Sequence, residues 1–159
     1  MKIRVICIGK LKERFYTDAC AEYIKRLTRY CEPEIVELPD EKVAQDPSNA
    51  EIERVKSIEC GRLLDKLSPA DFVIALDPRG KQLSSEELAD SLRNIMINGK
   101  SRIAFLIGGS HGLTQEARNS SDMILSFSRM TFSHQIFRVM LLEQVYRAFK
   151  IISGEPYHK

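Results

Sequence analysis

The sequence predicts one α/β domain over residues 1–159, with a mostly parallel sheet covered by helices on both faces. Five short apolar runs lack the polar alternation of half-exposed strands, which is typical of strands buried on both faces. Segments with helical spacing separate these runs, as the crossover connections between parallel strands require. The length also suits one domain, since domains of about 100–150 residues are the commonest.

The first two expected strands flank an expected helix. Ile3–Ile8 is rich in β-branched residues and favours a buried strand. Over residues 12–30 the apolar side chains recur every four positions, which predicts one stripe of an amphipathic helix. Glu34–Leu38 then forms a second, shorter strand after Pro33.

The next segment contains a loop, a helix and a strand. Pro39–Asn49 is polar and is expected to be a surface loop, with Ser48 or Asn49 capping a helix that follows. Phe72–Leu76 is a continuous apolar strand, and residues 77–80 are expected to form a turn after it.

A capping box predicts where the third helix begins. Ser84 or Ser85 opens this helix, Glu87 completes the box to Ser84, and Gly99 ends it. Ile103–Ile107 is the next buried strand.

The last third of the chain ends in an unusual helix. A short helix from Thr114 leads to the final strand, Met123–Phe127. The helix over residues 134–152 is apolar all round, which suggests a subunit interface in so small a domain. Within it, Arg138 either pairs with a carboxylate or phosphate in the interior or extends its head to solvent, and the sequence leaves both open.

Composition restricts the classes of function. The formal net charge is +2, from 24 basic and 22 acidic residues, so nucleic-acid binding has to come from a local basic patch. No apolar run approaches the ~20 residues of a membrane helix, and the charged N-terminal pattern is not that of a signal peptide. We therefore expect a cytoplasmic protein without membrane contact.

Neither cysteines nor histidines indicate a metal site. The four cysteines form no CxxC pair, so we expect reduced, mostly buried thiols. The spacing of His111, His134 and His158 matches no metal motif, and His134 is expected to be a capping or packing residue. The tail with Tyr157 and His158 either lacks fixed structure or folds over a pocket, where it supplies a ring and a proton acceptor.

Three strand-end segments are expected to line one pocket, because ligands of open α/β sheets bind beyond the carboxyl ends of the strands. They are residues 76–80, 107–112 and 126–135. No P-loop or GxGxxG motif is present, and GGSHG alone is more often a tight strand-to-helix turn than a binding site. The third segment carries apolar residues that need burial against the core or a flat ligand such as adenine.

At these segments the sequence resembles the RlmH family of small SPOUT methyltransferases, also called the YbeA-like or OrfX family. The resemblance covers essentially the whole chain. It rests on IGKLKE (Ile8–Glu13), LDPRGK (Leu76–Lys81), FLIGGSHGL (Phe105–Leu113), LSFSRMTFSHQ (Leu125–Gln135), RVMLLEQVYRAFKI (Arg138–Ile151) and the terminal PYHK.

The resemblance implies a fold, an activity and a partner. The fold is an α/β sheet whose C-terminal segment forms a deep trefoil knot, and the protein is a homodimer. The activity is transfer of a methyl group from S-adenosylmethionine to N3 of a pseudouridine in 23S rRNA on the assembled ribosome, without a metal.

The resemblance also implies site residues. It implies catalytic roles for Tyr157 and His158, and His111 occupies a variable position with no expected role. Ser133 stands where relatives commonly have proline, which is expected to loosen the preceding loop slightly. The positions implied for cofactor binding are Leu76, Gly108, Phe127, Ser128, Arg129, Met130, Thr131 and Phe132.

We interpret His158 as the base that accepts the N3 proton, because an imide nitrogen must lose its proton to attack the methyl group. Arg129, Arg138 and Lys159 are the candidates for steering phosphates. Two alternatives remain at this point. One is a SPOUT enzyme acting on tRNA or on a ribose 2′-hydroxyl, and the other is a ribosome-associated nucleotide-binding module without catalysis.

Overall fold

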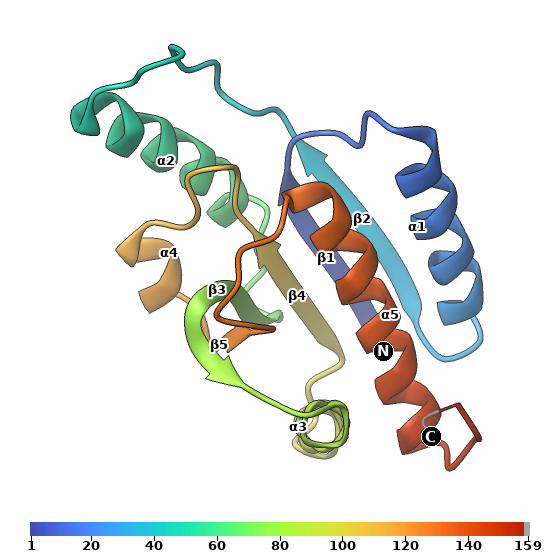
Figure 1. Ribbon diagram of the computed structural model, residues 1–159. Coiled ribbons are helices and arrows are strands. Elements are labelled where there is room, and N and C mark those ends of the chain that lie inside the picture. The colour runs from blue at the N-terminus through green and yellow to red at the C-terminus, as the bar shows by residue number, and fades with distance from the viewer. Residues whose placement is uncertain (158–159) are drawn as a thin grey trace.

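The computed structural model describes residues 1–157, and its centre is a five-stranded sheet (Figure 1). Every strand pairing is parallel, and the order across the sheet is β2-β1-β4-β3-β5. The predicted parallel α/β sheet is therefore confirmed. The strands are β1 (Lys2–Ile8), β2 (Glu32–Leu38), β3 (Phe72–Gln82), β4 (Arg102–Ile107) and β5 (Met123–Ser126).

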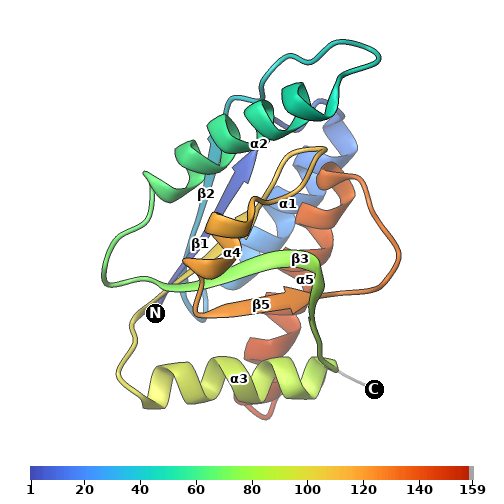
Figure 2. The same cartoon turned by 90° about the vertical axis from the view of Figure 1, so that its left-hand side faces the viewer.

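Helices cover both faces of this sheet (Figures 1 and 2). The helices are α1 (Arg14–Leu27), α2 (Asn49–Leu64), α3 (Ser85–Ile97), α4 (Gln115–Asn119) and α5 (His134–Ile152). α1, α3 and α5 share a core with one face, and α2 and α4 share a smaller core with the other. Within residues 1–157, no helix is long and apolar enough to cross a membrane.

The strand sequences explain why both faces are covered. Along β1, Ile3, Val5 and Cys7 contribute to the larger core, and Ile6 and Ile8 contribute to the smaller one. Side chains alternate between the faces of a strand, so a strand with buried apolar side chains on both faces needs helices on both sides.

The helix starts follow the predicted caps. The backbone N–H of Glu87 donates to Ser84 Oγ at 3.2 Å, and the Glu87 carboxylate accepts from the Ser84 N–H at 2.7 Å. This is the predicted capping box. At α2, the Ser48 hydroxyl accepts from the N–H of Glu51 at 3.2 Å, so Ser48 is the cap.

β3 differs from the prediction, because it continues past Leu76 to Gln82. On the neighbouring β5, Leu125 pairs with Leu76 and again with Lys81, so residues 77–80 bulge out of the ladder. The DPRG segment was predicted as a turn from its Asp, Pro and Gly. It forms a bulge instead of a turn, because the strand pairing resumes after it: Lys81 pairs with Leu125 and Gln82 with Ser126.

Arg138 of α5 is fully buried. Its Nη2 donates to the carbonyl oxygen of Gly9 at 3.0 Å, and its Nη1 donates to the carboxylate of Glu37. Of the two alternatives left by the sequence, the interior ion pair is therefore correct. The expectation that Arg138 steers phosphates is wrong, because solvent and substrate do not reach this guanidinium.

All four cysteines are free thiols, as predicted. Cys7, Cys20 and Cys60 are buried, and Cys31 is partly buried. Burial raises the pKa of both Cys7 and Cys31 to about 12, so these groups stay protonated and unreactive near neutral pH.

A substitution at Gly80 tests how closely the bulge of β3 approaches β5. A Cβ atom at Gly80 would lie 2.7 Å from backbone atoms of Ile124 and Leu125. Backbone cannot move aside as a flexible side chain does, so we expect Gly80→Ala to lower the free energy of unfolding by about 1–3 kcal/mol. Urea denaturation followed by circular dichroism measures this change.

Gly61→Ala is the matched control for this measurement. Gly61 lies inside α2, and a Cβ there meets nothing within 4 Å. Alanine is the better helix former, so we expect a gain of about 0.5–1 kcal/mol. Equal denaturation midpoints for the two variants would contradict the close approach at Gly80.

Candidate active site

The bulge of β3 and the carboxyl ends of β4 and β5 surround a cavity of about 580 Å³. Its walls include Leu76 and Asp77 at the bulge of β3, Gly108 after β4, and Leu125 and Ser126 at the end of β5. The predicted meeting of the three strand-end segments is therefore confirmed. The volume falls within the range of about 300–1,000 Å³ that is usual for small-molecule sites.

This cavity brings together seven of the eight residues implied for cofactor binding. Arg129 is the exception, because its side chain is exposed and does not contribute to the wall. Binding by these residues stays a prediction. The seven lining residues are Leu76, Gly108, Phe127, Ser128, Met130, Thr131 and Phe132.

The turn after β4 brings main chain directly to the cavity. A Cβ at Gly108 would lie 2.8 Å from the carbonyl carbon of Gly112, so only glycine fits there. The N–H of Gly112 closes the turn by donating to the carbonyl oxygen of Gly109 at 3.0 Å, and its φ is +77°. A wall without side chains allows a ligand to approach the backbone closely.

The loop between β5 and α5, residues 127–133, has its own internal order. The hydroxyl of Ser126 donates to the carbonyl oxygen of Ser128 at 3.0 Å, and Ser128 Oγ accepts from the N–H of Met130 at 3.0 Å. The rings of Phe127 and Phe132 lie 4.9 and 6.4 Å from the ring of Phe137 on α5. These contacts hold the loop against the first turn of the helix.

Ser133 ends this loop as the N-cap of α5. Its hydroxyl accepts from the N–H of Ile136 at 3.5 Å. A proline has no side-chain acceptor, so the serine in this chain supplies a cap that a proline lacks.

Two titratable side chains line the cavity wall, although no specific role was predicted for either from the sequence. Asp77 is 5% exposed and accepts from Arg79 at 3.1 Å and from Arg118 at 3.2 Å. Burial alone raises the pKa of Asp77, but the hydrogen bonds and charge of Arg79 and the charge of Arg118 outweigh it, so the pKa falls below its ordinary value. The signal for Asp77 was its position directly after a buried strand.

His134 is the second such group. It lines the cavity at the start of α5, where the sequence predicted only a capping or packing residue. Ser133 is the cap instead. Burial, together with the positive charge of Arg138, lowers the pKa of His134, so the imidazole is neutral near pH 7.

Tyr157 lies apart from the cavity of its own chain. Its hydroxyl donates to Glu143 at 3.4 Å, and its ring meets the ring of Tyr146 at 5.0 Å and the guanidinium of Arg147 at 4.9 Å. These residues are 6–10 positions beyond Phe137 on α5, which corresponds to about 9–15 Å along the helix. The other predicted catalytic residue, His158, lies outside the described residues, as does Lys159.

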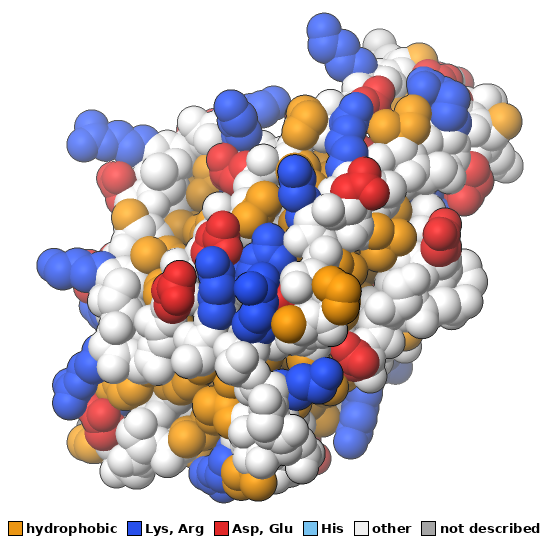
Figure 3. All heavy atoms as spheres, turned by 180° about the vertical axis from the view of Figure 1, so that it is seen from behind, with side chains coloured by type: hydrophobic (Ala, Val, Ile, Leu, Met, Phe, Trp, Pro, Cys, Tyr) orange, Lys and Arg blue, Asp and Glu red, His pale blue; other side chains and the backbone are white. Residues whose placement is uncertain are grey.

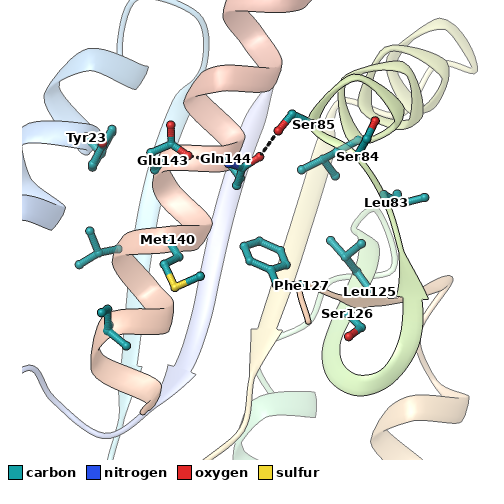
Figure 4. A pocket seen from close by; sticks show the side chains of 13 residues that line it. Tyr23, Leu83, Ser84, Ser85, Leu125, Ser126, Phe127, Met140, Glu143 and Gln144 are labelled. Carbon is teal, nitrogen blue, oxygen red and sulfur yellow. Dashed lines mark hydrogen bonds between the residues drawn. The ribbon is translucent and has the colours of Figure 1, made fainter. Parts of the chain in front are cut away.

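A second cavity of about 600 Å³ opens between α1, α3 and α5 (Figure 4). Figure 4 shows Met140 and Glu143 of α5 on one side and Ser85 of α3 on the other, with Phe127 between them. The Ser85 hydroxyl donates to the amide oxygen of Gln144 at 2.8 Å and bridges the two helices. Phe127 lines both cavities, together with Leu125 and Ser126.

Charge is mixed over the face seen from behind in Figure 3. There, a central group of Lys and Arg side chains has Asp and Glu side chains on either side. This agrees with the small net charge of +2.

Among residues 1–157, no three His, Cys, Asp or Glu side chains are grouped as metal ligands.

Comparison with known proteins gives full-length matches. The family described as "Predicted SPOUT methyltransferase" matches residues 1–158. The chain is 54% identical, over 159 residues and 100% of both chains, to the proteins named "Ribosomal RNA large subunit methyltransferase H" of Bacillus thuringiensis (strain Al Hakam) and Bacillus cereus (strain B4264).

Solved structures share the fold. The tRNA (m1G37) methyltransferase of Aquifex aeolicus superposes with a TM-score of 0.55 at 16% identity, over 100% of this chain and 75% of that one. A probable methyltransferase of Bordetella pertussis Tohama I gives a TM-score of 0.56 at 16% identity, over 92% of this chain and 93% of the other. By its full-length family match and its relatives, the chain belongs to the SPOUT methyltransferase family, among the ribosomal RNA large subunit methyltransferases H.

Proposed function

We propose that this chain transfers a methyl group from S-adenosylmethionine to N3 of a pseudouridine in 23S rRNA, on the assembled ribosome in the cytoplasm. The observation that carries the proposal is the cavity at three strand ends, in a chain 54% identical over its full length to enzymes named for methylation of large-subunit ribosomal RNA.

The cavity fits the proposed cofactor. Its wall offers the rings of Phe127 and Phe132 for a flat base, and the bare backbone at Gly108 for polar groups. Leu76, Ser128, Met130 and Thr131 complete the set of residues that would hold S-adenosylmethionine. The cofactor supplies an electrophilic methyl group on its sulfonium.

The chain's own contribution is to hold the uracil ring in line and to remove a proton. N3 of a pseudouridine is an imide nitrogen, which attacks once its proton has left. His158 is the proposed base, with Tyr157 beside it in the sequence to pack on the substrate. A neutral imidazole accepts a proton at the pH of the cytoplasm.

A homodimer explains two features of the chain, the uncovered apolar face of α5 and the position of Tyr157. Ile136 is 40% exposed, and Val139 and Met140 line the open second cavity, so an apolar helix face remains without cover in one chain. Tyr157 also lies away from the cavity of its own chain. In the proposed dimer, a second copy covers this face, and the tail of one chain completes the cavity of the other.

The finer fold assignment, a deep C-terminal trefoil knot, belongs to the same proposal. The bulge of β3 presses on the backbone of β5 at Gly80, and the chain after β5 continues into α5 between α1 and α3. A tight crossing of this kind is what threading of the C-terminal segment requires.

The first experiment identifies the product. The chain is incubated with S-adenosylmethionine and with ribosomes that lack the modification, and the nucleosides of each RNA are analysed by mass spectrometry. We expect N3-methylpseudouridine in 23S rRNA.

Other outcomes, of that experiment or of calorimetry with the cofactor and with ATP, contradict the proposal. Methylation of tRNA or of a ribose 2′-hydroxyl indicates another SPOUT activity. Calorimetry that detects ATP binding but no S-adenosylmethionine binding indicates a nucleotide-binding module without catalysis.

The second experiment tests the cofactor site. Gly108→Ala puts a methyl group 2.8 Å from the main chain of Gly112, so the turn that forms the wall has to shift. We expect calorimetry to give a Kd for S-adenosylmethionine that is at least about ten-fold higher, which equals a loss of about 1.4 kcal/mol of binding free energy. Gly61→Ala serves as the control, and equal affinities of the two variants would exclude Gly108 from the site.

The third experiment tests the shared tail. We expect His158→Ala to lower kcat by roughly a hundred-fold or more without changing the Kd for the cofactor, because a positioned base contributes about 10²–10⁴-fold. An unchanged kcat would show that His158 is not the base.

Coexpression of the His158→Ala and Gly108→Ala chains then tests where the tail acts. In mixed dimers, the intact tail of one chain meets the intact cavity of the other. At a cofactor concentration too low to fill the Gly108→Ala cavity, random pairing predicts recovery of about a quarter of the wild-type activity. Activity no higher than that of either variant alone would mean that each tail serves its own chain.

A further inference from the structure

The loop after β1, residues 9–13, is held firmly against the start of α5. Arg138 donates to the carbonyl oxygen of Gly9 at 3.0 Å. The N–H of Leu11 donates to Glu37 at 3.3 Å, and the N–H of Lys12 donates to the side-chain oxygen of Gln135 at 3.2 Å. Since Glu37 also binds Arg138, a buried guanidinium organises the whole loop.

This loop borders the proposed cofactor cavity. β1 is parallel to β4, so the loop leaves the same edge of the sheet as the turn that contains Gly108. His134 connects the two regions, since it lines the cavity and its Nε2 would lie 3.4 Å from a Cβ placed on Gly9. Figure 1 shows the β1–α1 connection beside the first turn of α5.

The anchored loop directs positive charge to solvent. Leu11 packs against the core, while Lys10 and Lys12 on either side of it are exposed. Within residues 1–157, neither lysine forms an ion pair with a carboxylate. The side chain of Arg14 is 93% exposed, and its 3.5 Å pair with the exposed Asp18 is a surface pair of little strength.

An aromatic ring lies at the end of this charged stretch. Phe15 is 61% exposed, which is unusual for a phenylalanine in a protein of this size. Phosphate contacts from lysine and arginine, combined with a ring that stacks on an unpaired base, are the means by which proteins hold single-stranded RNA.

We propose that Lys10, Lys12, Arg14 and Phe15 form the surface on which the substrate RNA docks, with the cations on phosphates and the ring on an unpaired base. This inference rests on the proposed function, because it assigns the docking surface of that same reaction. The surface also answers how a chain of net charge +2 holds RNA, since Lys10, Lys12 and Arg14 supply a local group of cations that outnumbers the one acidic residue among them, Glu13.

The anchoring explains why docking at this loop would place the target base correctly. The loop and the cofactor loop 127–133 are both fixed to the first turn of α5, through Gln135 and Arg138 on one side and Phe137 on the other. RNA bound to the first loop is therefore held at a fixed distance from the second.

The test uses the full-length protein and ribosomes that lack the modification, with methyl transfer measured over a series of salt concentrations. We expect Lys10→Ala/Lys12→Ala to raise KM for ribosomes at least about ten-fold at physiological salt, with kcat and the Kd for S-adenosylmethionine unchanged. The slope of log KM against log salt should fall by about 0.7–0.9 for each phosphate that the variant no longer neutralises.

Lys66→Ala/Lys100→Ala is the matched control. Both lysines are exposed and precede strands, so they lie near the opposite edge of the sheet. This variant loses the same charge, and its KM and salt slope should equal those of the wild type. Equal effects of the two double variants would overturn the proposal, because they would show a response to net charge alone.

Failure of this inference is distinguishable from failure of the proposed function. If the wild-type chain methylates 23S rRNA and Lys10→Ala/Lys12→Ala keeps the wild-type KM and slope, only the docking surface is wrong. If the wild-type chain does not methylate ribosomes, the proposed function itself fails.

Phe15→Ala tests the aromatic part. It should raise KM for ribosomes by roughly ten-fold, because stacking of one base contributes about 1–3 kcal/mol, while the protein keeps the wild-type oligomeric state in size-exclusion chromatography. A changed oligomeric state would assign Phe15 to the subunit interface and remove it from the docking surface.

Discussion

The buried guanidinium of Arg138 is the constraint on which the arrangement of the ligand edge depends. A charge taken out of water costs several kcal/mol unless it is paired and hydrogen-bonded. Here the partners are the carbonyl oxygen of Gly9 and the carboxylate of Glu37, which come from the ends of the first two strands. The first turns of α5 are thereby tied to the ends of β1 and β2, next to His134, which lines the cavity.

The cavity itself follows from the order of the strands. β4 and β3 lie side by side and β5 pairs with the outer edge of β3, so the bulge of β3 and the carboxyl ends of β4 and β5 converge although they come from distant parts of the sequence. Each end then contributes what its residues allow. The turn after β4 offers bare backbone, and the loop after β5 offers rings held by Phe137.

Much of this arrangement could be predicted from local patterns, and the exceptions have physical causes. The apolar runs identified the strands, and Ser84 with Glu87 located the start of α3, because both signals depend on neighbouring residues. The bulge at 77–80 was missed because its continuation depends on a partner strand some 40 residues later. Whether Arg138 is buried or exposed depends on its tertiary partners, which the local sequence does not specify. The same holds for the packing of Tyr157 against the second half of α5. Asp77 and His134 lie in the predicted strand-end segments, but the lowered pKa of each could not be predicted, since burial and neighbouring charges are set by the fold.

Phe127 contributes to the walls of both cavities. A single ring cannot relax toward one space without withdrawing from the other, so whatever occupies either space and shifts this ring alters the shape that the other presents. Thermodynamic linkage makes such an influence reciprocal, and each occupant changes the binding constant of its counterpart by one common factor. In the proposed function, a second copy covers one of these spaces and the methyl donor fills the other, so the free energies of the two binding events are coupled.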